Sequence, residues 1–225
     1  MSWTIPDVGY TTEYENDRTL DWIVHGSTGY HWTLVYNRSR TVTTVLWTSA
    51  ARNEPLHARH DHAHKERSIQ HMKNGGKCGE CGDDYSLLRP RPNENGGIYG
   101  TGIIVQKYKA GSTINVTVRL TASHMGYFEF SVCPLKTEKE LETDECFDQH
   151  YLLLADGSGH KFPINGAKDY VVRLILPKDV TCKHCVLRWN YRTGNTWGTC
   201  EDGKQGMGCG PQETFRSCAD VSIVN

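Results

Sequence analysis

The chain has 225 residues, a formal net charge of -1 and 37% hydrophobic residues. This length is enough for one β-sandwich with a sizeable core, or for two very small domains. The near-neutral charge gives no electrostatic reason to expect nucleic acid or an anionic membrane as a partner. No apolar run approaches the roughly 20 residues that a membrane helix needs, so we expect a soluble protein with no membrane partner.

Residues 1–70 differ in character from the rest of the chain. They contain none of the nine cysteines, alternate only weakly around residues 41–47, and include a basic, His-rich stretch at 57–65. An accidental basic loop is the favoured interpretation of that stretch, and binding of stray metal is the weaker alternative. We interpret 1–70 as an atypical N-terminal segment, mis-predicted or disordered, and 71–225 as the domain that carries the function.

Four segments of the second part alternate apolar and polar residues with a period of two, at 114–120, 128–132, 170–176 and 185–191. Loops rich in Gly, Pro and Asn lie between such segments. One buried and one polar face is typical of an antiparallel sandwich strand. The pattern therefore predicts one all-β domain.

The nine cysteines all lie between Cys78 and Cys218. This density is typical of an extracellular domain stapled by disulfides. The C-x-x-C pairs Cys78/Cys81 and Cys182/Cys185 leave a structural zinc site open, although zinc ribbons place their pairs about 15–20 residues apart. No βαβ pattern supports a thioredoxin-like motif. We favour a disulfide framework, and the odd count implies one cysteine without a partner.

The start of the chain gives no independent sign of secretion. A signal peptide has a basic start, an apolar core of about 7–15 residues and a small-residue cleavage site, and residues 1–26 have none of these. The segments 37–39 (Asn-Arg-Ser) and 115–117 (Asn-Val-Thr) are sequons, which are acceptor motifs for N-glycosylation. We expect a secreted, extracellular protein on the basis of the cysteines.

Long sequence words occur in order between residues 74 and 223. They are NGGKCGECGD (74–83), RPNE (91–94) with YG (99–100), TASHMGYFEF (121–130), CVLRW (185–189), NTWGTC (195–200) and GCGPQETFRSCAD (208–220). With these words the chain resembles the invertebrate type of lytic polysaccharide monooxygenase, auxiliary activity family fifteen, also described as a chitin-binding type-4 domain.

The resemblance implies an immunoglobulin-like or fibronectin-III-like antiparallel β-sandwich with long disulfide-stapled loops and a flat substrate-binding face. It also implies a copper ion in a histidine brace. In that brace an N-terminal histidine gives its α-amine and one ring nitrogen, and an internal histidine gives a third nitrogen. His124 matches the internal histidine and Phe215 the axial position. Glu213 matches the polar residue beside the copper, and Ala122 the small residue that packs over it.

The chemistry of these residue types agrees with the implied site. Imidazole is a good ligand for copper, and three nitrogens leave positions open for oxygen species. Because residues i and i+2 of a strand share a face, we expect Ala122 beside His124 and Glu213 beside Phe215. An axial aromatic ring blocks tight ligation, and a glutamate can orient an oxygen species or pass it a proton. Substrate-stacking residues could be among four aromatics that we otherwise expect mostly in the core: Tyr99, Tyr127, Trp189 and Trp197.

The N-terminal words of the family do not follow Met1. The resemblance implies a mature chain that starts with His-Gly and carries a further cysteine, whose absence agrees with the odd cysteine count. The only internal His-Gly is His25-Gly26, so His25 is the candidate for the first copper ligand after cleavage behind Val24. A free α-amine, with an ordinary pKa near ~8, ligates copper far more readily than an amide nitrogen.

We therefore predict a secreted, monomeric, copper-dependent lytic polysaccharide monooxygenase. It would cleave glycosidic bonds oxidatively in chitin or a similar crystalline β-1,4-polysaccharide such as cellulose, with an external electron donor. The alternative is a non-catalytic chitin-binding protein on the same fold, with an incomplete copper site. A third interpretation, an intracellular zinc-ribbon protein, requires reduced thiols. The sequence does not indicate chitin over cellulose, C1 over C4 oxidation, or the disulfide connectivity.

Overall fold

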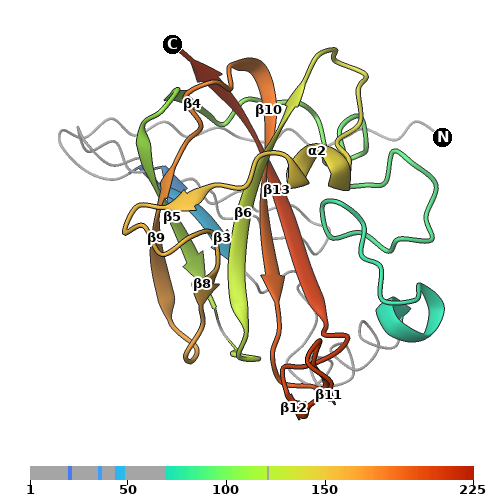
Figure 1. The fold of residues 1–225 in the computed structure, drawn as a ribbon. Helices are drawn as coiled ribbons and strands as arrows, with labels where there is room; N and C mark the ends of the chain where they lie inside the picture. The colour runs from blue at the N-terminus through green and yellow to red at the C-terminus, as the bar shows by residue number, and fades with distance from the viewer. Residues whose placement is uncertain (1–19, 22–34, 37–43, 49–68, 121) are drawn as a thin grey trace.

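The computed structural model describes residues 20–21, 35–36, 44–48, 69–120 and 122–225. His25, the His-rich stretch at 57–65 and the sequon at 37–39 lie outside these residues. The described elements (Figure 1) are β1 (Leu20–Asp21), β2 (Val35–Tyr36), β3 (Thr44–Thr48), a π-helical turn η1 (Ile69–Lys73), β4 (Gln106–Lys109), β5 (Thr113–Arg119), β6 (Tyr127–Leu135), α2 (Asp144–Asp148), β7 (Leu153–Leu154), β8 (Phe162–Pro163), β9 (Asp169–Ile175), β10 (Cys182–Arg192), β11 (Trp197–Thr199), β12 (Gln205–Met207) and β13 (Thr214–Val224).

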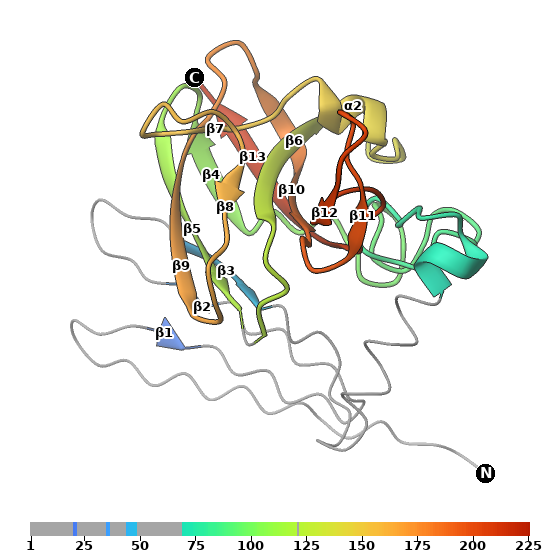
Figure 2. The same cartoon turned by 60° about the horizontal axis from the view of Figure 1, so that its bottom comes forward.

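Two sheets form the layers of a sandwich (Figures 1 and 2). One sheet has the strand order β4-β13-β10-β6-β8 and the other β3-β5-β9-β7. Neighbouring strands are antiparallel except β13 with β4 and β3 with β5. This arrangement confirms the predicted all-β, immunoglobulin-like sandwich. In the part of the chain that the structure describes, no helix is long and apolar enough to cross a membrane.

The core lies between the two sheets and follows the predicted alternation in β5 and β9. Both strands bury every second residue, including Val116 and Leu174. The opposite sheet contributes Phe128 and Tyr191, whose rings meet edge to face with their centroids 5.0 Å apart. Burying an aliphatic or aromatic side chain of this size stabilises the fold by about 1.5–3 kcal/mol relative to exposure. The prediction for 114–120 and 170–176 is therefore confirmed.

The prediction of one polar, solvent-facing side is wrong for β6 and β10. Glu129 and Ser131 on β6 and Arg188 on β10 are 8%, 1% and 2% exposed, although they alternate with core residues. Helix α2 lies over this outer face (Figure 1), and the guanidinium of Arg188 sits 4.0 Å from the centroid of the Phe147 ring. Alternation records residue type only, and so it cannot reveal that a second layer covers the polar side.

The short helix α2 begins at a typical cap. The side chain of Thr143 accepts a hydrogen bond from the backbone N–H of Cys146 at 3.2 Å, which satisfies one of the free donors of the first turn. The disulfide between Cys133 and Cys146 then ties the helix to β6. Phe147, fully buried, anchors a small apolar cluster between the helix and the sheet.

The cysteines form disulfides, as predicted. The pairs are Cys81–Cys218, Cys133–Cys146, Cys182–Cys185 and Cys200–Cys209. Since three members of the two C-x-x-C pairs are bonded in this way, those pairs do not form a zinc site. Cys78 is the cysteine left over, and burial raises the pKa of its thiol to about 11.

The segment 74–105 crosses the outer face of the five-stranded sheet and holds a charge cluster in which Glu80, Arg91 and Glu94 are buried and Arg89 lies at the exposed edge. The guanidinium of Arg91 contacts carboxylate oxygens of both Glu80 and Glu94, at 2.6 Å for Glu80. Arg89 donates from Nε to Glu94 at 2.8 Å. Burial alone would raise the pKa of Glu94, but the Arg91 backbone N–H and the Arg89 guanidinium outweigh it and lower that pKa.

Candidate functional site

His124 lies in the loop between β5 and β6. The expectation that Ala122 and His124 share one face of a strand is therefore wrong. The loop turns sharply, because Met125 has a φ of 59° and Gly126 a φ of 80°. A Cβ atom on Gly126 would lie 2.1 Å from the carbonyl oxygen of Arg192, so only glycine permits the loop to cross the end of β10 this closely.

The end of β10 and the turn behind it hold both His124 and Glu213 by their backbones. The N–H of Gly194 donates to the carbonyl of His124 at 2.9 Å, and the N–H of Thr193 donates to the carbonyl of Glu213 at 3.0 Å. The Tyr191 hydroxyl accepts from the His124 N–H at 2.9 Å and donates to the Met125 carbonyl at 2.7 Å. The segment around His124 and the segment around Glu213, which are distant in sequence, are thereby both held against the turn at residues 193–194.

The imidazole of His124 has one nitrogen engaged. Its Nδ1 lies 2.9 Å from the side-chain amide of Asn195, which leaves Nε2 as the nitrogen for a metal. The Asn195 atom nearest Nδ1 is the amide nitrogen Nδ2, which donates to Nδ1. Ligation through Nε2 places the ring proton on Nδ1, and the Asn195 amide then has to turn over so that its oxygen accepts that proton. Burial lowers the pKa of His124, which favours the neutral ring that a metal requires.

Asn195 was not among the residues that the sequence predicts for the site. It is 71 positions from His124, so no local spacing connects the two. The only signal is that Asn195 opens one of the long words of the resemblance, NTWGTC at 195–200.

Glu213 and Phe215 lie two positions apart in the sequence, at the beginning of β13. Glu213 directly precedes the strand and is 6% exposed. The half-buried ring of Phe215 lies between two others, with centroid distances of 6.1 Å to His124 and 5.9 Å to Tyr191. The structure thus brings His124, Glu213 and Phe215 to one end of the sandwich. Ala122 is exposed in the same loop as His124, two residues before it.

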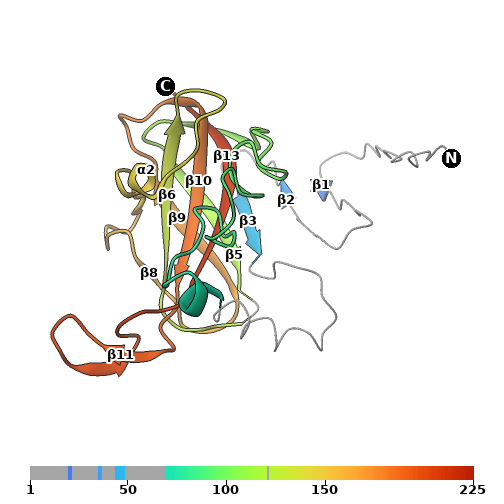
Figure 3. The same ribbon diagram turned by 90° about the vertical axis from the view of Figure 1, so that its right-hand side faces the viewer.

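The hairpin β11–β12 projects beyond the sandwich from this end (Figure 3). Its base is clamped by Gln212, which accepts from the Thr196 N–H at 3.0 Å and donates to the carbonyls of Thr196 and Cys209. The disulfide between Cys200 and Cys209 closes the hairpin. It is therefore a fixed feature next to His124.

The expectation that most of the four aromatics are buried is wrong. Only Trp189 belongs to the core, at 3% exposed. Trp197 is 62% and Tyr99 44% exposed, and Tyr127 is half-buried. Trp197 stands on β11, outside the two layers, and so has no opposite sheet to cover it.

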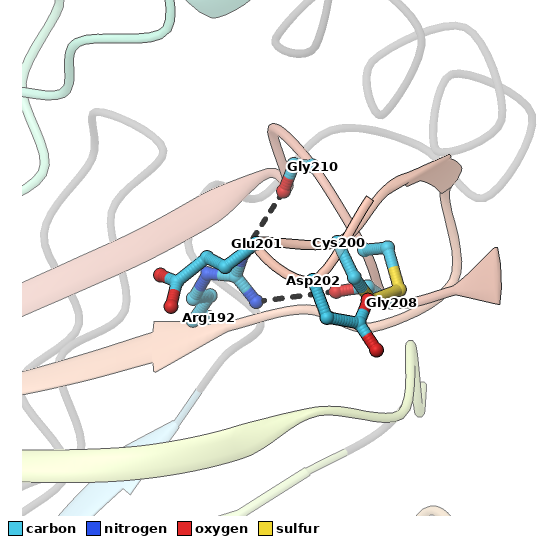
Figure 4. Close-up of a pocket in the computed structure, with 7 residues that line it drawn as sticks. Arg192, Cys200, Glu201, Asp202, Gly208 and Gly210 are labelled. Carbon is cyan, nitrogen blue, oxygen red and sulfur yellow. Dashed lines mark hydrogen bonds between the residues drawn. A yellow bond between two sulfur atoms is a disulfide. The ribbon is translucent and has the colours of Figure 1, made fainter. Parts of the chain in front are cut away.

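A hollow of about 410 Å³ opens beside this hairpin (Figure 4). Arg192 crosses it and donates to the carbonyls of Gly208 at 3.5 Å and Gly210 at 2.9 Å, while the carboxylates of Glu201 and Asp202 lie at its rim. Its lining includes none of the predicted site residues. The predicted site residues gather at the loop of His124, so we place the candidate site there and not in this hollow.

The donor atoms that the structure describes fit one arm of a histidine brace. Among the described residues, the one cluster of three metal-ligating side chains is Cys81, Glu142 and Cys218, and its two sulfurs are joined in a disulfide. His124 does not belong to that cluster, so it offers a metal only one imidazole nitrogen of its own. The remaining nitrogens of a brace would come from residues outside the described ones, such as His25.

Comparison with known proteins agrees with this geometry. The family model described as lytic polysaccharide mono-oxygenase, cellulose-degrading, matches residues 26–221. The chain belongs to the lytic polysaccharide monooxygenase family. A solved structure, the lytic polysaccharide monooxygenase AA15 from Thermobia domestica in the Cu(I) state, is 58% identical to it. That similarity covers 69% of this chain and 81% of the other, with a TM-score of 0.67. No curated protein matches.

Membership of the lytic polysaccharide monooxygenases supports oxidative cleavage of polysaccharides as the general function. The family match starts at residue 26, inside the segment 1–70 that we interpret as atypical, and β3 within that segment pairs with β5. The boundary near residue 70 stays a prediction, as do the roles of the individual site residues.

Proposed function

We propose that this lytic polysaccharide monooxygenase is a copper-dependent enzyme that acts on chitin or a similar crystalline β-1,4-polysaccharide, with His124 as a copper ligand. The observation that carries the proposal is the His124 ring, which Asn195 contacts at Nδ1 and which lies 6.1 Å from the Phe215 ring between centroids. The similar Thermobia domestica protein is named in its Cu(I) state, which supports copper as the metal.

When bound, copper supplies the redox chemistry by which an external electron donor and oxygen or hydrogen peroxide oxidise C1 or C4 of a sugar. The protein's own residues prepare that chemistry. Asn195 orients the His124 ring, and Phe215 would place an aromatic ring instead of a strong ligand beside a copper held by His124. Glu213, whose backbone is held at the same turn as that of His124, would hold or pass a proton through its carboxylate. Ala122, two residues before His124, has only a methyl group and would leave room for the copper and its substrate.

The other two nitrogens of the brace belong to a histidine at a free N-terminus. His25 is the candidate within this sequence, because it is followed by glycine as the resemblance requires. Its α-amine becomes a ligand only after the peptide bond to Val24 is cleaved, since an amide nitrogen loses its proton far less readily than an ammonium group.

Trp197 extends the proposed site toward the substrate. Its indole is 62% exposed on the clamped hairpin that adjoins His124, and a sugar ring stacks well on such an aromatic face. A polysaccharide surface, an external reductant, an extracellular location and a monomeric state complete the proposal.

Release of oxidised oligosaccharides tests the proposal. The chain that begins at His25, secreted behind a heterologous leader that is cleaved directly before this residue, is loaded with copper. It is incubated with ascorbate and either β-chitin or cellulose, and the products are identified by mass spectrometry. We expect oxidised chito-oligosaccharides from the wild type and from His160→Ala, whose ring lies against Tyr151 away from the site. The variant His124→Ala should release none above background. Equal release by His124→Ala would contradict the proposal.

The second candidate is a non-catalytic chitin-binding protein on the same fold. It is favoured by one observation, namely that among the described residues no group of three side chains that could ligate a metal includes His124. Tight adsorption of the wild type to chitin without any oxidised product, at copper saturation, would select this candidate over the enzyme.

A further inference from the structure

The outer face of the four-stranded sheet carries a sequon in the middle of a strand. Asn115 and Thr117 lie on β5 and are both half-buried, while Ile114, Val116 and Val118 between and beside them point into the core. Residues i and i+2 of a strand share a face. The two side chains that an N-glycosylation signal requires, the asparagine amide and the threonine hydroxyl, therefore project together from the same open side.

Nothing in the described fold accounts for an asparagine at this position. Asparagine is depleted in strands, because its side chain competes with the ladder and does not pack well. Within the part of the chain that the structure describes, no hydrogen bond to the Asn115 amide is found. Its strand neighbours on this face have clear structural roles, such as Arg119 in an ion pair with Asp169 at 3.0 Å.

The surface around Asn115 mixes polar side chains with exposed apolar ones. Across the ladder Asn115 faces Arg173 on β9, with Val171 and Ile175 on the two diagonals. Val171 is 59% and Ile175 37% exposed, and Leu153 on β7, opposite Ile175, is 53% exposed. Diagonal neighbours in a sheet are about 7–8 Å apart, which is within reach of the first sugar of a glycan. Figure 2 shows β5 and β9 side by side in this layer.

We propose that Asn115 is an N-glycosylation site and that its glycan covers the exposed apolar strip formed by Leu153, Val171 and Ile175. The Nδ2 nitrogen of Asn115 forms a bond to C1 of the first N-acetylglucosamine. The bond from C1 to the pyrophosphate of a lipid-linked oligosaccharide donor breaks, and one amide proton is lost to base. The inference rests on the proposed secretion and is independent of the copper chemistry.

The position of Asn115 leaves the proposed catalytic end free. The loop of His124 follows the Arg119 end of β5, and Asn115 lies four residues before that end. At about 3.3 Å per residue, this separates the glycan from the end of the strand by roughly 13 Å. The glycan would therefore stand on the flank of the sandwich while the enzyme rests on a solid substrate.

Peptide mass spectrometry of the full chain, secreted from insect cells, tests the inference. The tryptic peptide 110–119 contains this sequon alone, and the other sequon falls in a separate peptide, 19–38. Treatment with a peptide N-glycosidase in heavy-oxygen water should convert Asn115 to labelled Asp. We expect Asn115→Gln and Thr117→Val to lose the labelled product, and the control Thr117→Ser, which keeps the sequon, to retain it.

The folded protein tests the placement of the glycan. Because the side chain projects from an open face, the enzyme should release the glycan without denaturant. An unmodified peptide 110–119 in the secreted wild type would overturn the proposal, whatever the variants do. Release only after denaturation would overturn the claim that the glycan lies on the exposed strip. Copper binding and polysaccharide cleavage are measured separately, so failure of either would not be confused with failure here.

Discussion

The two sheets of the sandwich differ in what covers their outer faces. On the five-stranded sheet, segment 74–105 and α2 form a further layer, so Glu129 and Arg188 are buried although they face away from the core. On the four-stranded sheet the corresponding positions of β9 are open, and Val171 is 59% exposed. On the covered face, charged side chains are buried away from water. On the open face, apolar side chains are exposed to water.

The outer faces of the two sheets therefore differ in how firmly the structure is held and in how well they tolerate substitutions. The covered face belongs to the same sheet, β6, β10 and β13, that ends at His124 and Glu213. Charge pairs and disulfides fix that face, because buried charges are stable only with their partners in place. The open face carries only exposed pairs and, as we propose, a glycan.

Breaking one buried charge pair should cost far more than breaking an exposed one. Arg91→Met leaves the buried carboxylates of Glu80 and Glu94 without their shared partner, and we expect a loss of about 3–5 kcal/mol in the free energy of unfolding. The matched control Arg119→Met removes a pair in which both side chains are about half exposed, with an expected loss of at most about 1 kcal/mol. Urea unfolding followed by circular dichroism measures both. Equal losses would refute the contrast between the faces.

Asn195 links the covered face to the site, and its removal should weaken copper binding without unfolding the protein. We expect Asn195→Ala to lower the affinity for Cu(II) by roughly 10–100-fold, because the His124 ring loses the group that fixes its tautomer and orientation. Asn195→Asp keeps an acceptor for the Nδ1 proton and should retain most of the affinity. Competition titration with a chelator measures the affinities, with Thr199→Ala on the same hairpin as the control. Equal weakening by the Asp and Ala variants would argue against this role.

The smallest expected effect concerns pH. Burial would raise the pKa of Asp144, but the guanidinium groups of Arg216 and Arg188 outweigh it and lower that pKa. A lowered folded-state pKa stabilises the fold above the ordinary pKa of an aspartate, about 3.9, and this contribution is lost as the pH falls through the folded value. Asp144 is 43% exposed, so solvent screening limits the effect to about 1 kcal/mol.

We expect Asp144→Asn to be less stable than the wild type at pH 7 and to approach it as the pH falls below about 4. Urea unfolding at a series of pH values measures the difference. A difference that stays constant down to pH 2 would show that Asp144 does not act through its charge.

The sequence predicts the open layer better than the covered one, for a physical reason. Period-two alternation identified β5 and β9 correctly because their polar side chains are exposed or half-buried while the residues between them are buried. The same pattern failed for Ser131 and Arg188 because a distant segment, brought there by the fold, covers them.

Prediction of the site from the sequence has the same limit. The long words located His124, Glu213 and Phe215, and the structure places them at one end of the sandwich. Strand periodicity misplaced Ala122, because glycine at 126 turns that segment into a tight loop. The pairing of His124 with Asn195 depends on tertiary structure and has no local signal.

The most direct test of the account is the electron paramagnetic resonance spectrum of Cu(II) bound to the chain that begins at His25, for the wild type, His124→Ala and His160→Ala. The account predicts one distinct copper signal that the wild type and His160→Ala share and His124→Ala lacks. An unchanged signal in His124→Ala would mean that this histidine is not a ligand, and the proposed site would have to be abandoned.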